Sequence, residues 1–191
     1  MGLNDPFIVR YVNYMLGLCQ GDLGTSYKTR DPVGEEVWAR LPNTAMLALT
    51  STVVAILLAL PLGIIAAIKQ NTLFDGISMF ISLLGISMPV FWMGLLLILF
   101  FSVKLGWFPV SGADQGIKSL VLPSIALGFM HMASIARTTR SSMLETIRQD
   151  YIRTVRAKGL PEKEVITRHA LRNALIPTTT VIGLQIGGML G

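Results

Sequence analysis

The chain has 191 residues, of which 52% are hydrophobic and only 14% are charged, and its mean hydropathy is +0.60. Soluble domains usually carry about 25% charged residues, so this composition excludes an ordinary soluble domain and indicates an integral membrane protein. Cys19 is the single cysteine, which excludes an intrachain disulfide, and we interpret it as a packing residue.

A polar N-terminal segment, residues 1–43, precedes the first run of residues without formal charge. This run, Thr44 to Ile68, contains 25 residues between Arg40 and Lys69. Roughly 20 apolar residues are enough to cross the hydrocarbon core of a bilayer. The run therefore predicts the first membrane-spanning helix.

Two further charge-free runs predict a second and a third span. Residues 76–103 form a run of 28 residues with Pro89 in its middle, which predicts a kink or a tilted, partly interfacial first half. The third run, residues 120–136, is shorter and carries Ser124 and His131, whose polar atoms should face protein rather than lipid. His131 has no second histidine or carboxylate nearby, so we interpret it, like Asp75, as structural.

A fourth apolar run begins at Ile176 and reaches Gly191 before it is long enough to cross a bilayer. The polar segment of residues 1–43 should not cross a membrane unaided, and no positively charged start with an apolar signal region precedes it. We therefore expect a missing upstream helix as well as an unfinished last helix. The sequence is expected to be truncated at both ends.

The cations are concentrated in one segment, which indicates the orientation in the membrane. Nine of the 16 Lys and Arg residues lie between Arg137 and Arg172, whereas residues 1–43 and 104–119 together carry six bases and six acids. Basic loops remain in the cytoplasm. We therefore expect residues 137–176 to be cytoplasmic and residues 1–43 to be external.

The basic segment has the pattern of two helices joined by a turn. In the first helix, a residue suited to one buried face recurs every four positions, at Met143, Ile147, Tyr151 and Val155. Gly159 suits the left-handed position that commonly ends a helix, and Pro161 suits the first turn of the next one. A basic pair of helices between apolar segments suggests a surface that another subunit could grip.

Five blocks of sequence carry a family resemblance: GDLGTSY (21–27), RLPNT (40–44), the run from Leu84 to Gly112, LPSIALG (122–128) and RAKGLPEKEVITRHALRNALIP (156–177). In these blocks the chain resembles the permease subunits of binding-protein-dependent ATP-binding-cassette (ABC) importers, in the dipeptide, oligopeptide and nickel branch. The resemblance implies an all-α membrane protein, a polytopic helical bundle of the type I ABC importer permease kind. Residues 44–191 would form its incomplete transmembrane domain, with three complete spans and the start of a fourth.

The resemblance implies that the cytoplasmic loop, residues 137–176, docks into a cleft on an ATPase subunit. The residues expected to couple to the ATPase are Arg153, Arg156, Ala157, Lys158, Gly159, Leu160 and Pro161. The broader importer motif has Glu-Ala-Ala six to four residues before the glycine, where this chain has Arg153, Thr154 and Val155. The salt bridge of that glutamate is therefore not carried over to this chain.

The expected translocation path is marked by fewer residues. Ser87, Met88 and Pro89 interrupt the second span, and broken helices often line the substrate cavities of transporters. Gln185 is a polar residue in the last helix that could face the same pore. A simple structural kink at Pro89 is an equally good interpretation.

The resemblance implies a permease subunit that forms half of the pathway for small peptides, or for nickel or other small solutes, in a bacterial or archaeal plasma membrane. The expected partners are a homologous second permease, two ABC ATPase subunits, an extracytoplasmic substrate-binding protein and the lipid membrane. The phosphate-cradling pattern GxxxxGK[ST] is absent, so this chain is expected to be no enzyme and to hold no cofactor, with ATP and Mg bound by the partner ATPases.

Three other functions compete with that of a permease subunit. A truncated non-functional fragment or a membrane scaffold would share the apolar spans. A membrane-anchored nucleic-acid binder could use the basic helices, although no nucleic acid is expected as a partner because that function leaves the permease-like spans unexplained. An intramembrane hydrolase would need convergent His, Glu or Asp residues within the spans, and the sequence lacks them.

Overall fold

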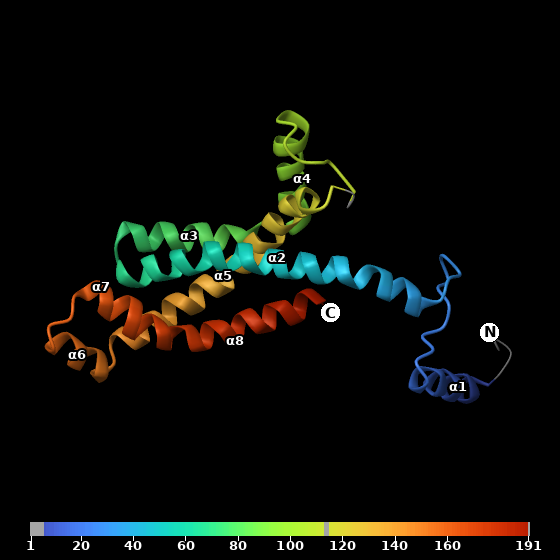
Figure 1. The fold of residues 1–191 in the computed structure, drawn as a ribbon, viewed down its shortest axis with the longest axis horizontal. Helices are drawn as coiled ribbons and strands as arrows, with labels where there is room; N and C mark the ends of the chain where they lie inside the picture. The colour runs from blue at the N-terminus through green and yellow to red at the C-terminus, as the bar shows by residue number, and fades with distance from the viewer. Residues whose placement is uncertain (1–5, 113–114, 191) are drawn as a thin grey trace. The chain divides into compact units, whose positions relative to one another are not determined.

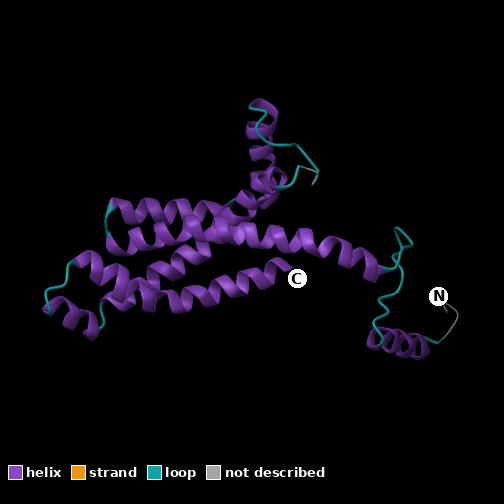
Figure 2. Ribbon diagram, viewed as in Figure 1, coloured by secondary structure: helices purple, strands orange, loops and turns teal. Residues whose placement is uncertain are grey.

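The computed structural model describes residues 6–112 and 115–190, and within them every regular element is helical (Figure 2). This confirms the predicted all-α class. The chain divides into two compact units, residues 1–46 and residues 47–191. The second unit contains all the helices that form the candidate site.

The first unit contains α1 (Phe7–Cys19) and the beginning of α2 (Val33–Ile68). Between these helices the chain makes a local turn, in which the Ser26 N–H donates to the Asp31 carbonyl oxygen at 2.9 Å. α1 exposes aromatic and aliphatic side chains along its whole length. α2 starts with Glu35 and Glu36 in its first turn, where acidic side chains favour the positive end of the helix dipole.

α2 ends at Ile68, as predicted, but it begins eleven residues before the predicted span because a charge marks the edge of the apolar run and not the start of a helix. Its buried side is made of small residues, which allow close approach of another helix: Ala48, Ser51, Thr52, Ala55, Ala59, Gly63, Ala66 and Ala67. A Cβ added at Gly63 would lie 2.7 Å from the carbonyl oxygen of Ala136. The backbones of α2 and of α5 (Ile117–Ile147), which contains Ala136, are therefore in direct contact at this glycine.

The second predicted span is broken. α3 (Leu73–Ser87) is followed by α4 (Val90–Leu97) and by a π-helical stretch, η1 (Ile98–Lys104), and the two halves are bent by 101°. Pro89 stands in the break, where it lacks the N–H that would continue the helix. The predicted kink is confirmed, and the bend of 101° is so large that α3 and α4 are separate helices.

The third predicted span lies within α5 (Ile117–Ile147). Ser124 is buried there and shares a hydrogen bond of 2.7 Å with Thr50 of α2, so its polar atom faces protein as predicted. By length and composition, α2 and α5 can each cross a membrane, and α3 with α4 and η1 adds a third span if the bent pair is counted as one.

The last part of the described chain, residues 150–190, folds back along α5. It contains α6 (Asp150–Ala157), the short α7 (Glu162–Glu164), a second π-helical stretch, η2 (Val165–Ala170), and α8 (Leu171–Leu190). α7, η2 and α8 follow one another without a break, with Pro177 inside α8. Figure 1 shows α3 and α8 running alongside α5, with α6 and α7 at one end of this bundle.

Candidate functional site

The α6–α7 turn, residues 158–161, exposes Lys158, Gly159 and Pro161. α6 ends at Ala157, and Gly159 takes a positive φ of 80°, with its N–H donating to the Arg156 carbonyl oxygen at 2.9 Å. Pro161 has φ −64° and immediately precedes α7. The predicted left-handed glycine is confirmed, and the proline lies at the start of the second helix as expected.

An ion pair closes the two ends of this turn. The Arg156 Nε and Nη2 atoms donate to the two carboxylate oxygens of Glu162 at 3.0 and 2.6 Å. These hydrogen bonds hold the pKa of Glu162 below its ordinary value, against a smaller opposing effect of desolvation, and they raise the pKa of Arg156. Both side chains remain substantially exposed, so the pair orders the turn more than it stabilises the fold.

The remaining predicted coupling residues fall into two groups. Four of them are exposed on or beside the turn: Ala157, Lys158, Gly159 and Pro161. Arg153 is also exposed and contacts Asp150 at 3.3 Å, whereas Leu160 is half-buried and packs inward. The structure thus brings the seven predicted residues together around one turn, and their role in coupling stays a prediction.

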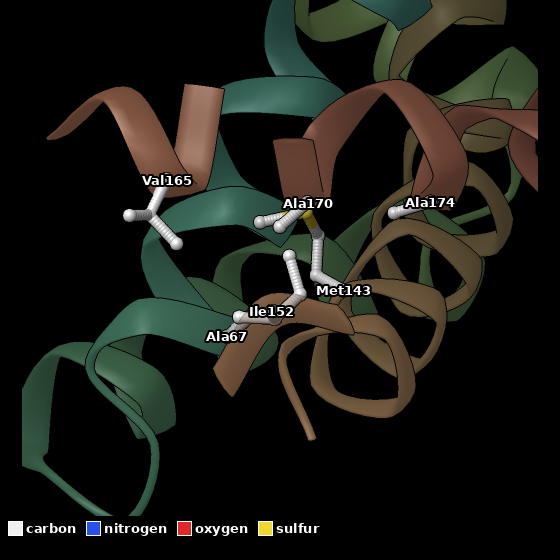
Figure 3. Close-up of a cluster of buried hydrophobic side chains, with 6 residues drawn as sticks. All are labelled: Ala67, Met143, Ile152, Val165, Ala170 and Ala174. Atoms are coloured by element: carbon white, nitrogen blue, oxygen red, sulfur yellow. The ribbon is translucent and has the colours of Figure 1, made fainter. Parts of the chain in front are cut away.

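A core cluster of six buried side chains lies beneath the turn, and Figure 3 shows how they meet. Its members are Ala67, Met143, Ile152, Val165, Ala170 and Ala174. They come from the end of α2, from α5, from α6, from η2 and from α8. Leu160 of the turn therefore packs against a cluster whose side chains include residues of three long helices, α2, α5 and α8.

One sequence prediction about this region is wrong. α5 runs to Ile147, and the chain leaves the helix at Arg148 before α6 begins, so the four-residue repeat does not lie on a single helix. Ile152 is the fully buried residue of α6, whereas Tyr151 is 39% exposed. The Tyr151 hydroxyl instead accepts a hydrogen bond of 2.6 Å from Asn173 Nδ2. The break resets the helical phase, and this could not be inferred from the repeat.

Sequence reasoning also missed an ion pair between α3 and α5, in which Asp75 is buried and Arg140 is half-buried. The Arg140 Nε and Nη2 atoms donate to the Asp75 carboxylate at 2.8 and 2.7 Å, and the Asn71 N–H donates to the same carboxylate at 3.0 Å. Asp75 is 6% exposed. Its partner lies 65 residues away, but a lone acid at the end of an apolar run was a signal that a partner was needed.

The residues expected to line a pore lie at two places. Ser87, Met88 and Pro89 occupy the 101° break between α3 and α4, where the Ser87 hydroxyl donates to the Leu83 carbonyl oxygen at 3.0 Å. Gln185 is half-buried on α8. A broken helix suits a substrate pathway, and the pore-lining role stays a prediction.

Comparison with known proteins covers the whole chain. Residues 59–191 match the sequence family described as binding-protein-dependent transport system inner membrane component. The chain is 46% identical to a dipeptide transport system permease protein of Alkalihalophilus pseudofirmus. It is 43% identical to an oligopeptide transport system permease protein of Bacillus subtilis and 44% identical to a glutathione transport system permease protein of Salmonella typhi. All of this chain is matched, and it spans 66%, 63% and 62% of these relatives, respectively.

Proposed function

We propose that this chain, which belongs to the family of binding-protein-dependent transport system inner membrane components, forms half of the translocation pathway of an ATP-driven importer of small peptides. Relatives named for dipeptide, oligopeptide and glutathione transport support a peptide as the substrate over a nickel chelate or another small solute. The protein would be a multi-pass component of a bacterial or archaeal plasma membrane, with residues 137–176 in the cytoplasm.

The proposed assembly needs several other subunits. A homologous second permease would complete the pathway, an extracytoplasmic protein would deliver the peptide, and two ABC ATPases would bind ATP and Mg and hydrolyse the nucleotide. Coupling in this arrangement is mechanical: ATP-driven closure of the motor shifts the permease between inward-open and outward-open states. This chain would therefore contribute half of the translocation pathway and a docking surface for an ATPase subunit.

The observation that carries the proposal is the exposed α6–α7 turn seated on the core cluster. The turn has a defined path, because Gly159 can adopt the positive φ that the path requires and the Arg156–Glu162 pair joins its two ends. The core cluster beneath it contains side chains from α2, α5 and α8. A protein that grips the turn can thus move these helices without entering the membrane.

The arrangement of charges weighs against a nucleic-acid binder. Four of the nine cations between residues 137 and 172 are paired with acids in the structure, namely Arg140, Arg153, Arg156 and Arg168. Nucleic-acid binding needs cations that remain free to neutralise phosphates. A mixed, internally paired surface suits a protein partner better.

Reconstitution of the full-length permease with its partner subunits tests the proposed function. We expect labelled dipeptide to accumulate in proteoliposomes only when ATP, the ATPases and the binding protein are all present. Ala157→Arg should abolish uptake and ATPase binding because it places a large charged side chain on the exposed turn. Thr72→Arg, at an exposed position of the turn between α2 and α3 and outside residues 137–176, is the matched control and should retain both. A permease that inserts and assembles but takes up no peptide would contradict the proposal and favour a scaffold or a non-functional fragment.

A further inference from the structure

We propose that the Asp75–Arg140 ion pair locks α3 to α5, so that both helices move as one body and carry the displacement of the α6–α7 turn to the broken helix. Asp75 and Arg140 are positioning residues in this proposal, since neither needs to touch substrate or ATPase. The inference rests on the proposed function, because the displacement in question is the one that the ATPases impose.

The geometry of the pair makes it a rigid connection. Both carboxylate oxygens of Asp75 are held by the planar guanidinium fork of Arg140, at 2.8 and 2.7 Å, so rotation as well as separation of the two groups is restricted. The backbone N–H of Asn71, which has a positive φ of 60°, binds the same carboxylate. One buried carboxylate thus ties together α3, α5 and the turn that joins α2 to α3.

A second contact holds the other end of α3 against α5. A Cβ added at Gly85 would lie 2.0 Å from the Phe129 carbonyl oxygen, so the two backbones are in direct contact there. Between this contact and the ion pair lies a cavity of about 460 Å³, lined by Met79, Ser82, Leu83, Ala133, Arg137, Arg140 and Ser141. The ion pair holds α3 to α5 on the Asp75 side of this space, and the Gly85 contact holds them on the other side.

The pair also lies on the direct route from the α6–α7 turn to the break in the helix. Arg140 is one helical turn before Met143, whose side chain belongs to the core cluster beneath the turn. A push on the turn reaches α5 at Met143, passes to α3 at Asp75 and arrives at the 101° bend after Ser87. Without the pair, α5 could move while α3 lagged behind.

Distance measurements between spin labels test whether the two helices move as one body. Labels on Phe74→Cys and Ser141→Cys, in a cysteine-free background of the full-length transporter, stand on exposed residues next to the two members of the pair. We expect the label distance to change by less than about 2 Å between the nucleotide-free and ATP-trapped states, which is no more than a typical helix shift. Asp75→Asn should broaden or shift the distance distribution. A larger change in the unsubstituted pair overturns the proposal.

The ratio of peptide taken up to ATP hydrolysed provides the functional readout. Asp75→Asn and Arg140→Gln should each lower this ratio by about fivefold or more while ATP hydrolysis continues, and the double variant should be no worse than either single one. Arg137→Gln is the matched control, because it removes a charge one turn away on α5 from an exposed side chain. The proposal would be contradicted by an unchanged ratio of peptide uptake to ATP hydrolysis in both single variants. A double variant whose loss equals the sum of the two single losses would also contradict it.

Failure of the positioning role can be told apart from failure of the proposed function. If the unsubstituted transporter shows no ATP-driven uptake, the proposed function fails, and the distances between the labels still report on α3 and α5. If Arg140→Gln does not assemble, Arg140→Lys keeps the positive charge but removes the fork, and an unchanged ratio in that variant counts against the proposal.

Discussion

Replacing Gly159 by other residues tests whether the path of the backbone at the α6–α7 turn depends on glycine. At φ 80° an L-residue costs about 1–2 kcal/mol, except that asparagine tolerates this region better. A Cβ added at Gly159 meets nothing within 4 Å in this chain, so size should not matter in the isolated permease. A loss of this size corresponds to about a 5- to 30-fold fall in the population of the ordered turn.

Amide hydrogen exchange at Val165 is a suitable assay, because its N–H is bound to the Pro161 carbonyl oxygen at 3.1 Å just after the turn. In the detergent-solubilised full-length permease, Gly159→Ala should speed exchange there by about 5- to 30-fold, and Gly159→Asn by much less. Gly159→Pro should be the worst, since it also removes the N–H that binds Arg156. Faster exchange in the asparagine variant than in the smaller alanine variant would refute the reasoning from φ.

Three further predictions concern the packing and charges around the site. Gly85→Ala should lower the thermal stability of the solubilised protein, because its Cβ would collide with the α5 backbone, whereas Gly76→Ala on the same helix, with open space around it, should not. Ile152→Ala should cost about 2–5 kcal/mol of unfolding free energy, measured by denaturant titration, because the side chain is fully buried; a loss under about 1 kcal/mol would contradict its role in the core cluster. Because the pKa of Glu162 is lowered, its pair with Arg156 should stabilise the turn fully at any pH above the ordinary carboxyl pKa of about 4.3. This stabilisation should be lost as the pH falls through the lowered pKa. A fall in the amide exchange protection factor of the turn between about pH 8 and pH 5 would contradict this direction of the pH dependence.

The elements set by composition could be predicted from the sequence. A charge-free run placed the end of α2 at Ile68, and Pro89 placed the break between α3 and α4. Gly159 and Pro161 placed the turn between α6 and α7 because few other residues suit those backbone angles. These features depend on residues close together in the chain, so local chemistry is enough to locate them.

The features that depend on distant partners or on helical phase could not be predicted. The two-residue break after Ile147 shifts the buried position of α6 from Tyr151 to Ile152. The partner of Asp75 is a cation 65 residues away, and any of several arginines fits the sequence pattern equally well. Packing decides both features, because it selects which of several compatible contacts is made.

The central claim is that an ATPase subunit binds the α6–α7 turn. Co-purification tests it most directly. The full-length tagged protein would be isolated from its native membrane in mild detergent, its partners identified by mass spectrometry and ATP hydrolysis of the complex measured. We predict recovery of a second permease and ATPase subunits, with loss of the ATPases alone when residues Ala157 to Pro161 are altered. Retention of active ATPase subunits by the altered protein, or isolation of the unaltered protein without any ATPase, would contradict the account.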